Sequence, residues 1–559
     1  MDTVTAWVKP PEKITGRDHL GARVPCETLY ARLIPGITNV TNRARYYSFY
    51  PWLIWAFGQH YKSLSDSKFV ENLRRADCLL TLIGAWHGGL LEDDHPEDSW
   101  RHGGELVGRL VLLNVLKGLD GSGEKACRLS SYTRLKDSSE RYFKNKLGGL
   151  GQYYFGSLRE LGVLEGDAKS FVKYTKERGG VLAEAFDKGV SIKKFFDAIE
   201  EDKVTVSTFK SLNAFCPCGL ASNAGEQNAL VNMFFNRPGD FFDEDGQARR
   251  QTLALLLDFV AQIEGFPDVG DQGVSNEGLF RACAYTGSLP GGKTWTAPNA
   301  LEPIRRGWMI YQRNELLSVA LQGIFWAALH GLMEQGGVVE NRRAISDWFV
   351  SSFAEAILGN KCGETFAAAV ERVRKRMPRL ADWADESHEI HLAWRLVYDA
   401  QPNADTKVRE SVVHLGIDIL LALASRSTTE ADPYEGFVSP AELTDYPINL
   451  FTFHERSRGT WREMRLADLL RWLVTEWGLD VHFRVALRKL RGESKDTFRI
   501  RPTDDGLEVI DAPPPEFSNP RLRQAYHILC DLGAMERDQE NGLLSLTDLG
   551  RSLLEEYFG

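Results

Sequence analysis

Leu158-Arg-Glu-Leu-Gly-Val-Leu-Glu165 recurs as Leu529-Cys-Asp-Leu-Gly-Ala-Met-Glu536 near the carboxyl end of this chain. Each stretch is followed by a similar second one, Tyr174-Thr-Lys-Glu-Arg-Gly-Gly-Val-Leu-Ala-Glu-Ala-Phe186 and Leu546-Thr-Asp-Leu-Gly-Arg-Ser-Leu-Leu-Glu-Glu-Tyr-Phe558. In both copies an amphipathic helix ends at Leu-Gly, and an apolar strand and a polar turn follow. A Thr then stands before a closing helix, where it can act as a cap. The pattern predicts the order helix, hairpin, helix, twice.

This order of elements is how a winged helix-turn-helix module ends. Such modules insert a helix into a groove of duplex DNA or bind protein partners, and they rarely carry chemistry. We therefore expect two winged-helix-like modules with small β wings, and a protein that works by binding.

The rest of the chain has the hydrophobic spacing of helices, which predicts a mainly α, multi-domain protein. A length of 559 residues is too great for one core, and 43% hydrophobic and 26% charged residues are ordinary for a soluble globular protein. We expect four segments: an N-terminal helical domain (1–125), a winged-helix-like module (126–190), a central helical domain (191–430) and a C-terminal winged-helix-like domain (431–559).

The composition also narrows the location and the kind of partner. A net charge of −10 argues against a general nucleic-acid coat or an anionic-membrane binder, although a local basic patch is still allowed. The most apolar stretch, 316–333, contains Gln322 and His330, which favours a buried helix over a membrane span. Eight cysteines and an N-terminus without a basic, apolar leader predict a cytoplasmic protein with reduced thiols.

The best candidate for a charged-ligand site is a basic stretch near the carboxyl end. Four of its residues belong to one expected helix, the next three continue toward a strand, and two begin the following helix. Alternation with Phe498 and Ile500 predicts that the strand arginines lie on the open face. Multi-arginine surfaces of this kind bind phosphates; the alternatives are a protein-contact surface or a solvated face paired with nearby acids. The set is Arg484, Arg488, Lys489, Arg491, Lys495, Arg499, Arg501, Arg521 and Arg523.

A second arginine motif lies near the N-terminus, in Thr41-Asn-Arg-Ala-Arg-Tyr-Tyr-Ser-Phe-Tyr-Pro-Trp52. Arg43 and Arg45 would clamp a phosphate while the aromatic side chains stack on a base. The favoured alternative is an aromatic core segment whose arginines pair with acids of the same chain.

Three further motifs point only weakly to chemistry. Gly287-Ser-Leu-Pro-Gly-Gly-Lys-Thr294 fits a phosphate-loop pattern, but Pro298 is a poor start for the helix that such a loop needs. Cys216-Pro-Cys218 is half of a metal site, for which Cys283 or Cys362 would have to supply the rest. His388-Glu-Ile-His391 is one residue short of the metalloprotease spacing. We therefore predict no catalytic residue, no metal ligand and no cofactor.

The N-terminal motif carries a resemblance. Pro35-Gly-Ile-Thr-Asn-Val-Thr-Asn-Arg-Ala-Arg-Tyr-Tyr-Ser-Phe-Tyr-Pro-Trp52 resembles the Pro-Gly…Thr-Arg-Ala-Arg-Tyr-Phe…Pro-Trp signature of uncharacterised bacterial proteins of mobile elements and anti-phage defence islands. It departs from that signature at Asn42, where the signature has Thr. The resemblance implies a genomic neighbourhood and transfers no catalytic residue.

The layout, with modules near both ends of a helical middle, is similar to that of kleisin subunits of SMC-type complexes. Kleisins use their end modules to grip ATPase subunits, so the resemblance implies a protein partner of that kind. The present chain differs because a substantial helical region precedes its first module.

The repeated module, together with what the two resemblances imply, predicts a non-catalytic subunit of a bacterial anti-phage or anti-plasmid defence system. It would bind a partner subunit, such as an ATPase, or duplex DNA, or both, with no membrane partner; homo-oligomers are also allowed. Two alternatives remain open. One is a metal-dependent nuclease or other effector enzyme with its site in residues 191–430, and the other is a DNA-binding transcriptional regulator.

Overall fold

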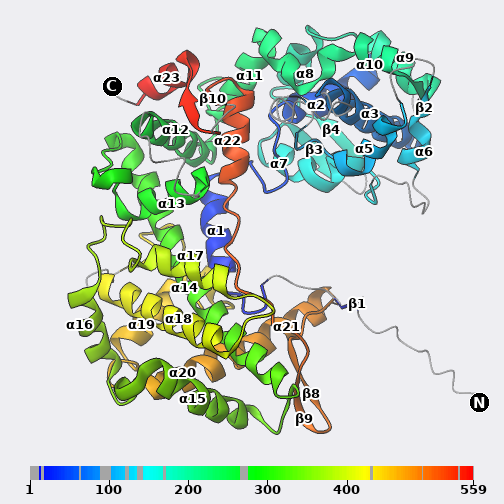
Figure 1. The fold of residues 1–559 in the computed structure, drawn as a ribbon. Helices are drawn as coiled ribbons and strands as arrows, with labels where there is room; N and C mark the ends of the chain where they lie inside the picture. The colour runs from blue at the N-terminus through cyan, green and yellow to red at the C-terminus, as the bar shows by residue number, and fades with distance from the viewer. Residues whose placement is uncertain are drawn as a thin grey trace, which may run out of the picture. The chain divides into compact units, whose positions relative to one another are not determined.

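The protein is mainly α-helical, as the sequence predicts. The computed structural model (Figure 1) describes residues 12–13, 18–61, 65–88, 102, 104–119, 125–134, 143–167, 171–264, 275–427, 432–493, 495–538 and 542–557. Its residues group into two compact units. Unit 1 comprises Met1–Ala31, Gly278–Thr296 and Arg305–Asn519, and unit 2 comprises Arg32–Glu277, Ala297–Ile304 and Pro520–Gly559. The expected segment 431–559 is thus divided at residue 519, and its last part belongs to the same unit as 126–190.

Unit 1 is built around α14 (Glu302–Glu334), the long apolar helix that the sequence predicts over 302–333. This helix is long and apolar enough to cross a membrane, but 94% of its apolar window is buried in the protein, as expected of a core helix. The helices of unit 1 are α1 (Val24–Leu33), α13 (Asn276–Thr286), α14, α15 (Arg342–Leu358), α16 (Phe366–Arg376), α17 (Glu389–Asp399), α18 (Thr406–Arg426), α19 (Leu450–Arg458), α20 (Leu466–Trp472), the π-helix η8 (Leu473–Asp480) and α21 (Val481–Glu493), with short 3-10 turns η4 (Pro290–Gly292), η6 (Gly359–Lys361) and η7 (Pro440–Leu443).

The hairpin expected after residue 497 is present in unit 1, and it gains a third strand. β8 (Ile500–Thr503) pairs antiparallel with β9 (Gly506–Val509), and β9 pairs on its other edge with β6 (Val338–Val339), which the sequence did not indicate. A parallel pair joins β1 (Glu12–Lys13) to β7 (Lys495–Asp496).

Unit 2 contains the N-terminal helices and both copies of the repeated pattern. Its helices are α2 (Tyr46–His60), α3 (Asp66–His87), α5 (Arg109–Lys117), α6 (Leu129–Thr133), the π-helix η1 (Leu150–Tyr154), α7 (Phe155–Glu160), α8 (Gly179–Asp187), α9 (Ile192–Glu201), α10 (Val206–Ser211), α11 (Ala224–Phe234), α12 (Gly246–Ile263), α22 (Leu522–Asp531) and α23 (Asp548–Glu555), with 3-10 turns η2 (Asn213–Phe215), η3 (Pro217–Ser222) and η5 (Asn299–Leu301). Its strands pair antiparallel as β2 (Cys127–Arg128) with β5 (Lys203–Val204), β3 (Leu164–Asp167) with β4 (Phe171–Tyr174), and β10 (Met535–Arg537) with β11 (Leu544–Leu546).

The predicted order helix, hairpin, helix is found in both copies. The first module runs from α7 through β3 and β4 to α8, and the second runs from α22 through β10 and β11 to α23. Each first helix ends at a glycine of positive φ, Gly162 (+65°) and Gly533 (+73°), a conformation that side chains disfavour. The hydroxyl of Thr175 donates to Gly162 O and that of Thr547 donates to Gly533 O, both at 2.6 Å. The same hydrogen bond, from a threonine hydroxyl to the carbonyl of the helix-ending glycine, is therefore present in both modules.

The closing helix of each module also lies against the turn that starts its hairpin. A Cβ added to Gly179, the first residue of α8, would lie 2.4 Å from Val163 O, and one added to Gly550 in α23 would lie 2.0 Å from Ala534 O. Real Cβ atoms do not come so close to a backbone oxygen, so only glycine fits at these two positions.

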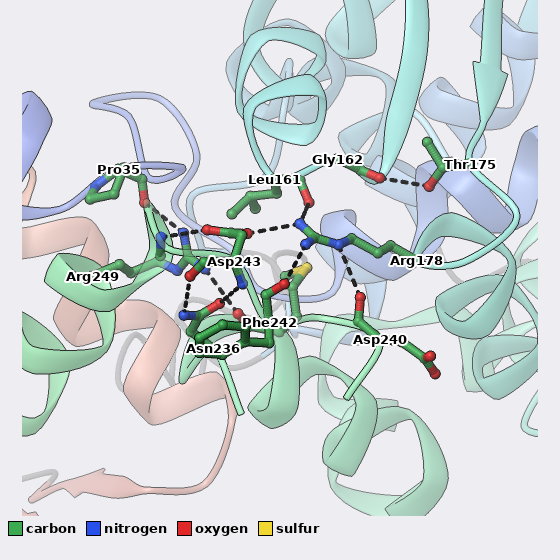
Figure 2. Close-up of polar contacts among 12 residues, drawn as sticks. Pro35, Leu161, Gly162, Thr175, Arg178, Asn236, Asp240, Phe242, Asp243 and Arg249 are labelled. Atoms are coloured by element: carbon green, nitrogen blue, oxygen red, sulfur yellow. Dashed lines mark hydrogen bonds and ion pairs between the residues drawn. The ribbon is translucent and has the colours of Figure 1, made fainter. Parts of the chain in front are cut away.

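The first module is joined to the following chain by Arg178, as Figure 2 shows. Its guanidinium donates to Leu161 O and to Asp243 Oδ2 at 2.8 Å, and also to Asp240 O and Phe242 O at 3.0 Å. One side chain thus connects the end of α7 to the loop that precedes α12. The second module packs on α12 through β11 and α23 (Figure 1).

We predict that Gly179→Ala destabilises unit 2 by about 1–3 kcal/mol, because the new methyl group clashes with a fixed carbonyl. The neighbouring Gly180→Ala is the matched control, since its Cβ would meet nothing closer than 3.8 Å. Replacing a helical glycine without strain stabilises a protein by about 0.4–1 kcal/mol. The urea midpoint of pulse proteolysis measures both, and equal effects of the two variants would contradict the proposed close approach.

Candidate metal centre

The N-terminal arginine–aromatic motif forms the core of unit 2, as the favoured interpretation predicted. Tyr46, Tyr47 and Trp52 of α2 are buried, and Arg43 and Arg45 are 2% and 3% exposed. Neither guanidinium is placed to clamp a ligand phosphate, because each one is already occupied by carboxylate and carbonyl oxygens of the chain itself.

Arg43 binds the last residue of α22. Its Nε and one terminal nitrogen each donate to a carboxylate oxygen of Asp531 at 2.9 Å, and another terminal nitrogen donates to Gly104 O at 2.8 Å. The amide of Ala44 donates to the same carboxylate at 2.9 Å. Burial opposes the charge of Arg43, but Asp531 outweighs it, so the pKa of Arg43 is raised. The two ends of unit 2 are therefore joined by a buried bidentate ion pair.

Arg45 binds the segment that carries the cysteine pair. It donates to both carboxylate oxygens of Glu226 in α11, at 3.2 and 3.1 Å, and Glu226 is fully buried. It also donates to Ala214 O at 2.7 Å and to Cys216 O. A Cβ at Gly219 would lie 2.4 Å from the guanidinium, so a glycine is needed there. Arg45 therefore fixes the turn that contains Cys216-Pro-Cys218.

Four side chains with metal-binding atoms converge on this turn. The ligand atoms of His87, His102, Cys216 and Cys218 all lie within 4.8 Å of one another. Cys216 Sγ is 3.5 Å from Nδ1 of His102, and Cys218 Sγ is 3.5 Å from Nδ1 of His87. The two imidazole rings stand 4.3 Å apart at a 58° angle. The sequence indicated only the cysteine half of this cluster.

Local structure explains how the four residues reach one point. His87 is the last residue of α3, and the two cysteines stand at the start of the 3-10 turn η3, where Pro217 occupies the first turn. Cys283 and Cys362, which the sequence offered as partners, are not part of the cluster. His102 stands in a charged, Gly-rich stretch of sequence without a periodic pattern, so sequence spacing gave no signal for either histidine.

The two thiols experience different electrostatic surroundings. A hydrogen bond from Cys216, followed by hydrogen bonding and charge from His102 and His87, lowers the pKa of Cys218 to about 4. Burial, followed by the interaction with Cys218, raises the pKa of Cys216. Metals bind the thiolate form of cysteine, so the lowered pKa of Cys218 is compatible with a role as a ligand.

The basic stretch does not form one continuous free surface. Arg484 and Arg491 are exposed on α21. Arg488 lies 4.4 Å from the ring of Tyr446, and Lys489 donates to Asp18 O at 2.6 Å. The side chain of Lys495 lies outside the described residues. Arg521 and Arg523 belong to unit 2, where Arg523 pairs with Glu105.

The expected open face is wrong for Arg499. Arg499 is 5% exposed and pairs with Asp511 at 3.3 Å, because β8 begins only at Ile500 and Arg499 precedes the alternating register. Arg501 is in the strand, where its side chain is 43% exposed and pairs across the hairpin with Glu508 at 3.1 Å.

The phosphate-loop match lies in the wrong structural context. Helix α13, rather than a strand, precedes it, and an antiparallel bridge between Ser288 and Thr294 closes it into a turn. Lys293 is exposed, as the turn interpretation predicted. His388, in the other histidine motif, caps α17 by accepting from Ile390 N.

A buried histidine explains why Arg499 is held inside unit 1. Nδ1 of His482 lies 3.0 Å from His19 O, and its Nε2 accepts from Arg499 N at 2.9 Å. These contacts require a neutral ring protonated at Nδ1. Burial, with a smaller effect from the charges of Arg499 and Lys489, lowers the pKa of His482 to about 4.

No family model, no curated protein and no solved structure matches the chain.

We predict that Asp531→Ala destabilises unit 2 by about 3–5 kcal/mol, since it leaves the charge of Arg43 buried without its partner. Replacing both residues, as Arg43→Met with Asp531→Leu, recovers most of this stability because no charge is then buried. Glu536→Ala, an exposed acid of the same module, is the control, with a change within about 0.5 kcal/mol. Urea unfolding of unit 2 measures the stability of all three variants. A small effect of Asp531→Ala would show that the Arg43–Asp531 ion pair does not stabilise unit 2.

We also predict a pH dependence of unit 1. His482 has a pKa lowered to about 4 in the folded chain and an ordinary pKa near 6.5 when unfolded, so the unfolded state takes up a proton first. Stability is therefore full above about pH 6.5 and falls by about 2–3 kcal/mol as the pH drops toward 4. Hydrogen exchange of the α21 amides, corrected for intrinsic rates, measures this decrease. His482→Gln should show a shallower decrease, and an unchanged slope would exclude His482 as its source.

Proposed function

We propose that this chain is a non-catalytic subunit of a multi-component bacterial anti-phage or anti-plasmid defence system. It acts in the cytoplasm, where it binds a partner subunit, duplex DNA or both. The observation that carries this proposal is the repeated helix–hairpin–helix module, which we interpret as a winged helix in both copies. Modules of this class act by contact with macromolecules.

The contacts of the second module favour a protein partner over base reading. In a winged helix the helix before the hairpin is the one that enters the DNA groove. In the second module this helix is α22, and its side chains make contacts within unit 2. Asp531 binds Arg43, and Gln524 donates to Asn39 O and to Asn42 Oδ1 at 3.1 and 2.9 Å. A helix held in this way supports assembly rather than sequence recognition.

A groove in unit 2 supplies a surface for such a partner. It has a volume of about 750 Å³, and its lining includes Asn39 and Asn42 of the N-terminal motif. Three aliphatic side chains that line it are exposed: Val40 (41%), Leu110 (81%) and Val111 (41%). Clustered exposed aliphatic groups favour a protein contact, because covering them removes apolar surface from water.

Any DNA contact is expected on α21 of unit 1, where Arg484 and Arg491 are exposed. Arginines reach phosphate oxygens without reading the bases. Replacing one phosphate-binding arginine would therefore weaken DNA binding at all sequences and reduce the salt dependence by about one counterion.

The proposal is tested by purifying the tagged chain from its native cells, with and without nuclease, and weighing what stays bound. We expect a stoichiometric protein partner that survives nuclease. Leu110→Glu should release it, whereas Tyr398→Glu, an equally exposed residue of unit 1 (80%), should not. Arg484→Glu with Arg491→Glu should reduce DNA retention, with the exposed Arg379→Glu as the control. Recovery of the chain alone, or no effect of either change on partner or DNA, would overturn the proposal.

A further inference from the structure

We propose that His87, His102, Cys216 and Cys218 bind one Zn²⁺ ion as a structural centre of unit 2. This inference goes beyond the proposed function and does not depend on it. It rests on the positions of the four ligand atoms, on the chemistry of the donor set and on the residues that surround it.

The spacing of the ligand atoms fits a tetrahedral ion. Zinc binds sulfur at about 2.3 Å and imidazole nitrogen at about 2.0–2.1 Å, so tetrahedral ligands place sulfur and nitrogen about 3.6 Å apart. Both pairs of sulfur and Nδ1 in the cluster are separated by 3.5 Å. Each residue presents one ligand atom to the same small volume.

The donor set selects the metal. Two thiolates and two imidazoles suit Zn²⁺, whereas Mg²⁺ and Ca²⁺ require oxygen ligands. Two thiolates also balance the charge of a divalent cation. A neutral centre is compatible with a location where Cys216 is fully buried and the other three residues are partly buried. The Cys-x-Cys spacing is one residue shorter than the usual zinc spacing, and the 3-10 turn at Pro217 brings the two sulfurs together.

The neighbours of the cluster orient two of the ligands. The amide nitrogen of Asn213 lies 3.4 Å from Nε2 of His87, while its Oδ1 has no partner among the described residues. With the amide turned by half a rotation, Oδ1 accepts from Nε2–H of His87, and the lone pair of Nδ1 then faces the ion. Arg45 holds Cys216 from the other side through the carbonyl oxygen.

Gly84 of α3 shows that the three ligand segments are packed together. A Cβ at this position would lie 2.6 Å from Leu106 Cδ1, 3.0 Å from His102 O and 3.2 Å from Pro217 Cδ. Helix α3, the segment of His102 and the cysteine turn therefore meet at one residue, one turn before His87. An ion bound there would join these three segments.

Four protein ligands fill a tetrahedral zinc site, so no position is left for substrate or an activated water. The centre is therefore structural rather than catalytic. It would fix the turn to which Arg45 donates, and with it the packing of this turn on α3.

The test measures metal in the purified full-length chain by plasma mass spectrometry after dialysis. We expect one Zn²⁺ per chain in the wild type and its loss in Cys218→Ser and His102→Ala. His102→Cys should keep the ion, because it replaces one zinc ligand by another, and this separates ligation from general unfolding. Cys362→Ser, a half-buried thiol of unit 1, is the matched control and should retain the ion.

Two further readouts make the result independent of folding. Co²⁺ bound in place of Zn²⁺ should give the visible absorption of a tetrahedral thiolate complex, with a stronger sulfur charge-transfer band in His102→Cys. Asn213→Ala should weaken zinc binding about 10–100-fold in competition with a chelating dye, as expected for a residue that orients a ligand. A wild-type chain that binds no Zn²⁺ or Co²⁺, or one that keeps its ion in Cys218→Ser, would overturn the proposal.

Discussion

Two buried arginine–carboxylate pairs hold unit 2 together. Arg43 binds Asp531 and Arg45 binds Glu226, and the two arginines are separated by one residue in the chain. Burying four charged groups is costly unless each is fully paired, and here every guanidinium also donates to backbone carbonyls. Because removal of one partner would leave a buried charge, these pairs specify one arrangement of distant segments.

The two ion pairs of the N-terminal motif bind different segments of unit 2. Arg43 attaches the C-terminal module, whose helix α22 then packs on α12, while Arg45 attaches the turn with the cysteine pair. The motif thus acts as the centre of a unit rather than as a ligand-binding surface. The same logic explains its aromatic residues, which form the surrounding core together with Tyr154 and Phe186.

The repeated module shows how a short pattern can encode a structure twice with different neighbours. In both copies a left-handed glycine ends the first helix and a threonine hydroxyl closes on its carbonyl. The surroundings differ: Arg178 joins the first copy to the loop before α12 (Figure 2), whereas Asp531 joins the second copy to Arg43. The hydrogen bond between threonine and glycine is local to each module, whereas the contacts that join the module to the rest of unit 2 differ between the two copies.

The sequence by itself determined the elements that are formed by local interactions. The helix–hairpin–helix order, the hairpin at Asp504 and Asp505, and the buried helix α14 all follow from periodicity, turn residues and apolar length. Tertiary structure alone decided which charges of the basic run are free, since Arg499 is buried beside Asp511 while Arg484 is exposed. It also brought His87 and His102 to the cysteine pair. Their separation along the chain has no period, so only the packing of α3, the segment of His102 and the cysteine turn makes them neighbours.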